Sequence, residues 1–272
     1  MVNGTVTRIK RVQGKALFRV TTADGGTVIG RKIVLATGLR DILPTTPGLR
    51  ENYGKGIWWC PWCDGHEHAD QPLAIFAPMN KVPGFVAEVS KLNSDIIAFV
   101  NGTNTPGMLD TAMLEYLKVR NITVENRIIT AIERLASGIT GEEDPSLPSV
   151  PEFDRFKIRF SIGRPIYRNA IFLAIDTEQA SNLGSQLGVH QIDGQLTANR
   201  TLGYETNIPG VYAVGDAGDG SPNVLEAMAS GKRAAVAIHF QLGFSEMMES
   251  VAHTVVPTDG FGPALGRDLV YC

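Results

Sequence analysis

Residues 73–100 read LAIFAPMNKVPGFVAEVSKLNSDIIAFV, and they carry the clearest signal for the fold class. Residues 73–77 and 95–100 are short apolar runs of the kind that form buried strands. Residues 85–92, which lie between them, have the apolar spacing of a helix. A strand, a helix and a second strand at this spacing predict a βαβ unit, and therefore an α/β protein with a parallel sheet.

The same alternation extends in both directions along the chain. Before this unit, a β-meander is expected over residues 5–11, 16–22 and 27–36. After it, we expect a helix at 108–119, strands at 122–124, 128–135, 156–162, 170–175 and 211–214, and a helix at about 223–242. Residues 141–151 are acidic and contain prolines, which predicts a loop, and the segment after Gly243 predicts an irregular tail.

Composition limits the class of protein. The 272 residues include 25 Lys and Arg against 28 Asp and Glu, and 43% are hydrophobic, so a substantial core in one large domain or two ordinary ones is expected. The near-neutral charge and the lack of a basic run argue against nucleic acid as a partner. The longest apolar runs fall short of the roughly 20 residues that span a bilayer, and no secretory signal is visible. We therefore expect a cytoplasmic protein without a membrane partner.

The sharpest local motif is WWCPWCDGH at residues 58–66. Two cysteines at i and i+3 can close a small disulfide ring. If this stretch opens a helix, the dipole favours the thiolate of Cys60, the form that attacks disulfides. Asp64 and His66 lie beside the pair and could transfer protons. These residue types favour redox chemistry through Cys60 and Cys63.

Two other interpretations of this motif stay open. Cys60, Cys63, His66 and His68 are potential zinc ligands, but structural zinc usually draws two ligand pairs from points a dozen or more residues apart. We therefore expect no metal. Buried, unreactive cysteines are the other alternative. The three tryptophans suit a platform for a flat ring or an apolar substrate, although core packing explains them equally well.

A second motif, TNIPGVYAVGD at residues 206–216, predicts a turn and a buried strand that ends in Gly215 and Asp216. Gly215 lets a ligand approach the backbone, and Asp216 places a carboxylate at the carboxyl end of a parallel strand, where α/β sheets bind ligands. The helix that follows from about Asn223 would offer free N–H groups. The motif therefore predicts a cofactor site, with an ordinary strand–loop–helix turn as the alternative.

Three motifs together resemble the low-molecular-weight thioredoxin reductases: IVLATG at 33–38, CPWCDG at 60–65 and PGVYAVGD at 209–216. Cys-Pro-Trp-Cys followed by Asp-Gly-His-Glu is most similar to the dithiol oxidases of secondary metabolism, of the gliotoxin and holomycin type. The resemblance covers residues 1–245 in segments. It implies an α/β, two-domain fold of the FAD/NAD(P)-binding type, truncated at the N-terminus. Residues 1–52 and 176–272 would form a discontinuous FAD-type domain and 53–175 a degenerate nicotinamide-type domain, in a homodimer.

The resemblance also implies roles for individual residues. Cys63 would lie nearest the flavin, Cys60 would meet the substrate, and Asp64 would be the acid–base residue, although the oxidase branch often has His there. Asp216 would bind the ribityl chain of FAD, and the backbone of residues 225–227 would face the pyrimidine end of the flavin. The expected cofactor-binding residues are Thr37, Gly38, Gly215, Asp216, Glu226 and Ala227.

Two departures from the family affect the cofactors. The family opens with a Gly-x-Gly-x-x-Gly βαβ unit that holds the FAD pyrophosphate, whereas this chain begins in the later β-meander and has no such run elsewhere. We therefore expect little or no tightly bound FAD in the chain as given. Residues 78–84, PMNKVPG, replace the second Gly-rich turn, and residues 100–103, VNGT, replace an expected arginine pair, so NADPH binding is not expected.

The sequence thus favours a thiol–disulfide oxidoreductase that acts on a small dithiol or disulfide through Cys60 and Cys63 without NADPH. If flavin binds, electrons would pass from Cys63 to FAD and then to oxygen. The alternative is a flavin-free pseudo-enzyme, or a partner-binding remnant of such an enzyme.

Overall fold

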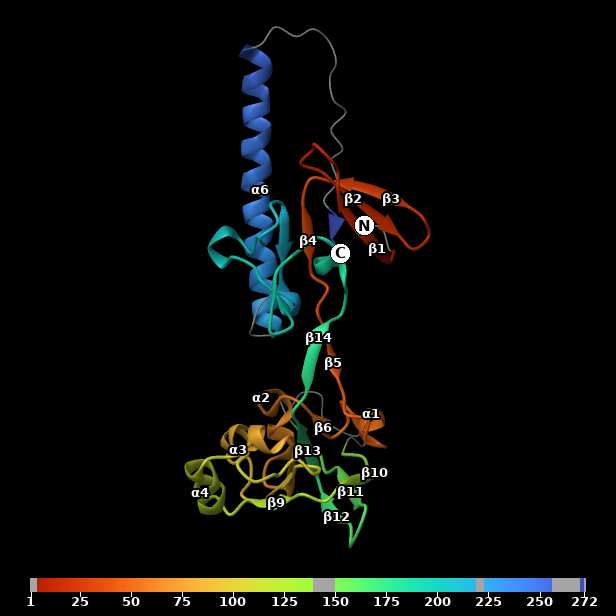
Figure 1. Ribbon diagram of the computed structural model, residues 1–272, viewed down its shortest axis with the longest axis vertical. Helices are drawn as coiled ribbons and strands as arrows, with labels where there is room; N and C mark the ends of the chain where they lie inside the picture. Colours follow the sequence, from red (N-terminus) through yellow and green to blue (C-terminus); the bar gives the residue numbers. More distant parts are fainter. Residues whose placement is uncertain (1–3, 139–149, 219–222, 256–269, 272) are drawn as a thin grey trace. The chain divides into compact units, whose positions relative to one another are not determined.

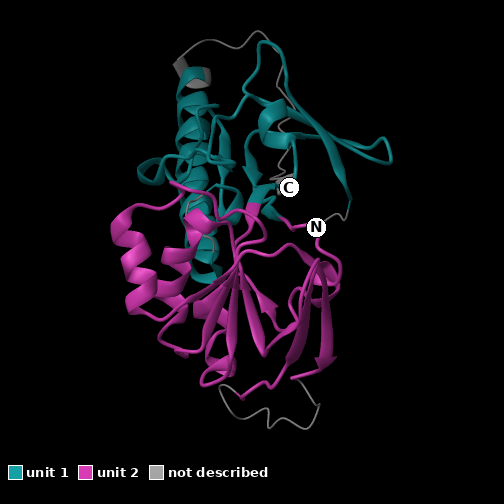
Figure 2. Cartoon of the chain, turned by 60° about the horizontal axis from the view of Figure 1, so that its bottom comes forward, with its two compact units in different colours: residues 1–41, 177–272 teal, residues 42–176 magenta. Residues whose placement is uncertain are grey.

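A computed structural model describes residues 4–138, 150–218, 223–255 and 270–271. The chain divides into two compact units, unit 1 with residues Met1–Asp41 and Thr177–Cys272 and unit 2 with residues Ile42–Asp176 (Figure 2). The sequence placed the first boundary after residue 52. In the structure it follows Asp41, because Leu49 is fully buried in the core of unit 2.

A parallel sheet forms the centre of unit 2 (Figure 1). Its strands lie in the order β6 (Ile57–Trp58), β13 (Ala170–Leu173), β7 (Leu73–Phe76), β8 (Ile96–Phe99) and β9 (Thr123–Glu125), and every neighbouring pair is parallel. The α/β fold with a parallel sheet, which the sequence predicted, is therefore confirmed.

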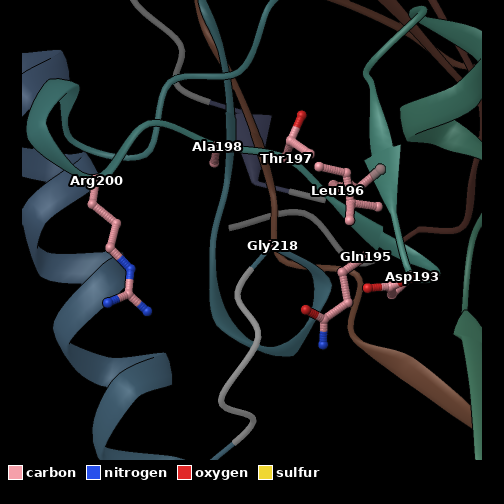
Figure 3. A pocket seen from close by; sticks show the side chains of 8 residues that line it. Asp193, Gln195, Leu196, Thr197, Ala198, Arg200 and Gly218 are labelled. Carbon is pink, nitrogen blue, oxygen red and sulfur yellow. The ribbon is translucent and has the colours of Figure 1, made fainter.

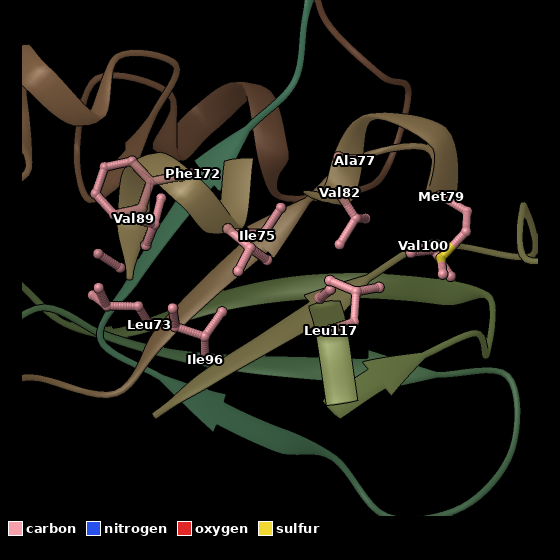
Figure 4. Packing of buried hydrophobic residues seen from close by; sticks show 13 residues of the cluster. Leu73, Ile75, Ala77, Met79, Val82, Val89, Ile96, Val100, Leu117 and Phe172 are labelled. Carbon is pink, nitrogen blue, oxygen red and sulfur yellow. The ribbon is translucent and has the colours of Figure 1, made fainter. Parts of the chain in front are cut away.

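Both faces of this sheet are buried. Leu73 and Ile75 of β7 pack with Val82 and Val89 of helix α3 (Val82–Val89) and with Leu117 of helix α4 (Thr111–Val119) (Figure 4). Successive side chains of a strand point to opposite faces, so the intervening residues of β7 reach the other face. There they join a cluster with the antiparallel sheet of β10 (Ile129–Ala136), β11 (Arg155–Phe160) and β12 (Ile166–Arg168). Burial on both faces is the reason that β7 is apolar throughout.

Unit 1 begins with the predicted β-meander, in which β1 (Val6–Arg11), β2 (Phe18–Thr22) and β3 (Thr27–Gly30) pair antiparallel. The next strand, β4 (Ile33–Leu35), pairs in parallel with β17 (Val211–Ala213) and with β18 (Val270–Tyr271). Strands β5 (Leu39–Ile42) and β14 (Asp176–Gln179) form a two-stranded sheet. The short elements are α1 (Leu49–Asn52), α2 (Pro61–Asp64), α5 (Leu183–Gln186), β15 (Gln191–Ile192), β16 (Gln195–Leu196), and 3₁₀ turns η1 (His66–His68), η2 (Met79–Lys81), η3 (Arg200–Leu202) and η4 (Gly215–Ala217).

Helix α6 (Val224–Val255) is longer than the sequence predicted. The expected irregular tail is wrong for residues 244–255, because the helix continues through Gly243 for three more turns, and residues 256–269 lie outside the described residues. Residues 244–255 contain no proline and include two Glu and two Met, residues that favour helix and help to outweigh one interior glycine. No helix in the described ranges combines the length and apolar character needed to cross a membrane. The loop predicted at residues 141–151 lies largely outside the described residues.

Candidate functional site

Cys60 and Cys63 are joined by a disulfide across a single helical turn. Cys60 is the N-cap residue of α2, its Cα lies 5.3 Å from that of Cys63, and its Sγ accepts a hydrogen bond from the Cys63 N–H at 3.1 Å. Pro61 occupies the first helical position, where its fixed φ suits a helix and its missing N–H is not needed. The local sequence therefore starts a helix at the point where the two sulfurs can bond.

The two cysteine residues differ in exposure. Cys60 is only 9% exposed, whereas Cys63 is exposed. Trp62, between them, is 85% exposed and Trp59 is 43% exposed, so these two indoles do not pack in the core. Their exposed rings give the neighbourhood of the disulfide the apolar surface that a small, flat substrate would contact.

Asp64 and His66 follow the disulfide directly, as the motif requires. Asp64 is half-buried, and burial, followed by the neighbouring charge of Glu67, raises the pKa of its carboxyl above the usual value. His66 is exposed at the start of η1. A carboxyl that keeps its proton to higher pH can protonate a thiolate that leaves the disulfide.

The four potential zinc ligands are not brought together as a metal site. The two cysteines are bonded to each other, so neither offers a thiolate. His68 is fully buried, its Nε2 accepts the indole N–H of Trp58 at 2.9 Å, and its Nδ1 lies 3.2 Å from the carbonyl oxygen of Glu152. Both ring nitrogens of His68 therefore already have partners.

The predicted cofactor residues of unit 1 lie at one end of the β4–β17 pair. These strands are adjacent and parallel, with Leu35 opposite Ala213, so Thr37 and Gly38 follow one carboxyl end and Gly215 and Asp216 follow the other. Both glycines have positive φ, 70° for Gly38 and 61° for Gly215, a conformation that glycine adopts without a Cβ penalty. Asp216 is half-buried.

Sequence reasoning missed two residues that support this turn. Ser230 is fully buried, and its Oγ accepts the Gly215 N–H at 3.0 Å and donates to the carbonyl oxygen of Glu226 at 2.7 Å. The Tyr204 hydroxyl donates to the Glu226 carboxylate at 2.6 Å. No local motif marks Tyr204, whereas Ser230 could have been found as a polar residue on the apolar face of a predicted helix.

The N–H groups of Glu226 and Ala227 are engaged in the first turn of α6. They donate to the side-chain oxygen of Asn223 at 2.8 Å and to its carbonyl oxygen at 3.0 Å, respectively. The helix itself therefore uses these two N–H groups, and the assignment of the backbone of residues 225–227 to the flavin stays a prediction.

One cavity of unit 1 borders the predicted cofactor residues. It measures about 450 Å³ and is lined mainly by apolar side chains, among them Ala36, Val214, Ala227 and Ile238. This cavity offers space beside both glycine turns for part of a large cofactor. A second cavity, of about 470 Å³, lies between residues 192–200 and Gly218 and is lined by none of the predicted cofactor residues (Figure 3).

In unit 2, the turn that follows β7 offers few free N–H groups. The N–H of Met79 donates to the Thr103 hydroxyl at 3.0 Å and that of Lys81 to the Pro78 carbonyl at 2.9 Å. Pro78 and Pro83 have no N–H to offer. A cavity of about 270 Å³ lies at this end of the sheet, lined in part by Ala77, Val100 and Ala174.

Comparison with known proteins identifies relatives along most of the chain. No protein-family model matches. A probable thioredoxin reductase of Arthroderma benhamiae is 42% identical over 252 residues, which are 87% of this chain and 61% of the relative. Thioredoxin reductase aclD of Aspergillus oryzae is 26% identical over 241 residues, 84% of this chain and 69% of the relative. The chain thus spans less than two thirds of the length of the Arthroderma relative.

Solved structures agree with the sequence relatives. HlmI superimposes with a TM-score of 0.77 and 26% identity, over 94% of this chain and 75% of HlmI. The putative thioredoxin reductase TrxB of Bacillus anthracis gives a TM-score of 0.74 and 26% identity, over 89% of this chain and 75% of TrxB. In both sequence and fold, the chain is therefore similar to thioredoxin reductases.

Proposed function

We propose that this chain is a thiol–disulfide oxidoreductase in which Cys60 and Cys63 exchange with a small dithiol or disulfide. The observation that carries the proposal is the Cys60–Cys63 disulfide, in a helical turn where Cys63 and the neighbouring Trp62 are exposed residues. The names of the relatives, which are thioredoxin reductases, support the same class of reaction.

The exchange moves two electrons and two protons from a dithiol to the cysteine pair. A substrate thiolate attacks Cys60 Sγ, the S–S bond breaks, and Cys63 leaves as a thiolate that takes a proton from Asp64. The second substrate thiol then attacks the substrate sulfur of the mixed disulfide and displaces Cys60. The product is a substrate disulfide and a reduced cysteine pair. The assignment of Cys60 to the substrate stays a prediction, and the greater exposure of Cys63 makes it necessary to test each cysteine separately.

The residues of unit 1 fit FAD at its ribityl end. Gly38, which follows Thr37, and Gly215 let a ligand approach the backbone, and the Asp216 carboxylate would accept a hydrogen bond from a ribityl hydroxyl. FAD, when bound, would supply an acceptor for the two electrons of the reduced cysteine pair. Residues 1–272 contain no Gly-x-Gly-x-x-Gly run for the pyrophosphate, so we propose that this chain by itself binds FAD weakly.

We further propose that NADPH is not the electron source. A pyrophosphate needs several backbone N–H groups in one turn, and those of Met79 and Lys81 are already bonded. The substrate dithiol is the electron source, and oxygen is the terminal electron acceptor. By resemblance to the family, we also propose that the chain forms a homodimer, lies in the cytoplasm and acts in secondary metabolism.

The test is the oxygen-dependent oxidation of a small dithiol, with FAD supplied. Cys63→Ser should abolish turnover, because this variant has no Cys60–Cys63 bond for the substrate thiolate to attack. Cys272→Ser, the third cysteine of the chain, is the matched control and should keep full activity. Unchanged activity in Cys63→Ser would overturn the proposal.

A second candidate function is a flavin-free protein that binds a partner. It is favoured by α6, on which Phe240 is 70% and Phe244 62% exposed. An exposed apolar helix face of this kind usually marks a surface that binds another protein. Light scattering after size exclusion tests it, because a stable monomer would count against both this candidate and the homodimer.

A further inference from the structure

The segment that carries the redox disulfide is acidic. Residues 56–80 contain both bonded cysteines together with Asp64, Glu67 and Asp70, and they include no lysine or arginine. His66, at the start of η1, is exposed beside them. A substrate that approaches the disulfide therefore meets negative side chains in this part of the sequence.

The folded chain brings one more carboxyl group to this segment. Glu152 precedes β11, and its N–H donates to the carbonyl oxygen of Glu67 at 2.8 Å. We call Asp64, Glu67 and Glu152 the acidic group. It joins two stretches of the chain that lie far apart in the sequence.

The members of the acidic group act on one another through space. Burial, followed by the charge of Glu67, raises the pKa of the Asp64 carboxyl. Burial, followed by the charges of Asp154 and Glu67, also raises the pKa of the Glu152 carboxyl. Asp64 acts on Glu152 in the same direction. The three carboxyl groups are thus close enough to repel one another.

The cation beside the acidic group has a carboxylate of its own. Arg134 lowers the pKa of Glu152, but its Nε donates to Asp154 Oδ1 at 2.7 Å, and the two side chains form an ion pair. Glu67 Oε2 is buried and has no hydrogen-bond partner among the described residues. The acidic group therefore keeps negative charge that the ion pair of Arg134 with Asp154 does not cancel.

The exposed indoles favour the same sign of charge in a ligand. Trp62 is 85% exposed and Trp59 is 43% exposed, and both lie next to a bonded cysteine. The face of an indole attracts a cation, because the ring quadrupole places negative charge there. Two different kinds of side chain thus favour a positive group beside the disulfide.

The exchange reaction itself brings negative charge to this surface. A substrate thiolate attacks the disulfide, one S–S bond forms as another breaks, and the leaving cysteine sulfur keeps the electron pair of the broken bond. A positive group on the substrate offsets the repulsion between the thiolate and the acidic group, whereas a second negative group increases it. The rate of attack should therefore depend on the charge of the substrate.

We propose that the surface around the Cys60–Cys63 disulfide selects small thiols by charge, with cationic thiols preferred to neutral ones and neutral thiols to anionic ones. Glu67 and Trp62 are the specificity-determining residues. The inference rests on the proposed thiol–disulfide exchange and narrows its substrate class to small thiols and disulfides without a negative group near the sulfur.

The test compares three thiols of similar size on the oxidised full chain: cysteamine, which is cationic, mercaptoethanol, which is neutral, and mercaptopropionate, which is anionic. Reduction of Cys60 and Cys63 is followed by alkylation and mass spectrometry. Each rate is divided by the rate of the same thiol with hydroxyethyl disulfide, an uncharged model, so that differences in thiol reactivity cancel. At about 0.01 M ionic strength, the relative rate of cysteamine should exceed that of mercaptopropionate by about threefold or more.

Salt provides a check that needs no variant. At about 1 M salt the screening length falls to about 3 Å, so the three relative rates should converge. Relative rates that are equal at low ionic strength, or that follow the reverse order, would overturn the proposal. A folded chain that none of the three thiols reduces would instead refute the proposed exchange reaction.

Two variants assign the selection to its residues. Glu67→Gln should bring the three relative rates closer together, and Trp62→Leu, which keeps an apolar side chain, should lower the rate of cysteamine alone. Glu115→Gln, which removes an exposed acid on α4 that pairs with Lys118, is the matched control and should discriminate as the wild type does. Discrimination that is undiminished in Glu67→Gln, or equally diminished in Glu115→Gln, would overturn the role of Glu67.

Discussion

Replacing Ser230 by Ala tests the support of the Gly215–Asp216 turn. The Ser230 hydroxyl accepts the N–H of Gly215 at 3.0 Å and is fully buried in the first turns of α6. Its removal leaves that N–H without a partner, which costs about 1–3 kcal/mol. Alanine favours helix over serine by about 0.5 kcal/mol, which offsets part of the loss. The net expectation is a decrease of about 1–2 kcal/mol in the free energy of unfolding of unit 1.

The assay must report on unit 1. All three tryptophans, Trp58, Trp59 and Trp62, lie in unit 2, so their fluorescence would miss the effect. Urea unfolding followed by circular dichroism at the helix band reports on α6, which is the longest helix described.

The matched control for this prediction is Ser245→Ala on the same helix. The Ser245 hydroxyl donates to the carbonyl oxygen of Gln241 at 2.8 Å, as that of Ser230 does to Glu226 at 2.7 Å, but Ser245 is exposed. The free energy of unfolding of Ser245→Ala should lie within about 0.5 kcal/mol of that of the wild type. Equal losses in the two variants would refute the reasoning, because the effect would then belong to the helix rather than to the turn.

Three further predictions follow from the site. In Cys63→Ser, a small disulfide should form a mixed disulfide with Cys60 that mass spectrometry detects, and an adduct that forms only in Cys60→Ser would reverse the two roles. The pKa of Asp64 is raised in the folded chain, so its protonation stabilises the fold below the ordinary carboxyl pKa, and this stabilisation is lost as pH rises through the raised pKa. Asp64→Asn should therefore flatten that part of the curve of unfolding free energy against pH. The purified chain should lack a flavin absorption band, since each missing hydrogen bond to the pyrophosphate weakens binding by about 1.5–3 kcal/mol, and a band near one flavin per chain would contradict this.

The parts of the fold that follow local rules could be predicted from the sequence. The β7–α3–β8 unit was visible because its strands are apolar on both faces and its helix has a helical apolar spacing. Cys60 and Cys63 were visible as a pair because their spacing fits one helical turn. The start of α6 was predicted to within a residue, but its C-terminal end was not, because Gly243 in isolation indicates a helix end and the residues beyond it outweigh that signal.

The parts of the site that depend on long-range contacts could not be predicted. Glu67 and Glu152 lie far apart in the sequence and meet only because β11 returns beside the turn after the disulfide. Likewise, nothing local to Glu226 indicates that its carboxylate accepts from Tyr204. Such contacts are set by topology, which a pattern of residue types does not specify.

The most direct test of the central claim is the redox behaviour of the folded chain. The oxidised chain is equilibrated with mixtures of reduced and oxidised dithiothreitol, its free thiols are alkylated, and the labelled positions are identified by mass spectrometry. We predict that Cys60 and Cys63 pass together, and reversibly, between unlabelled and labelled while circular dichroism shows the chain folded. Labelling of the pair only after denaturation would show an inert disulfide and would contradict the account.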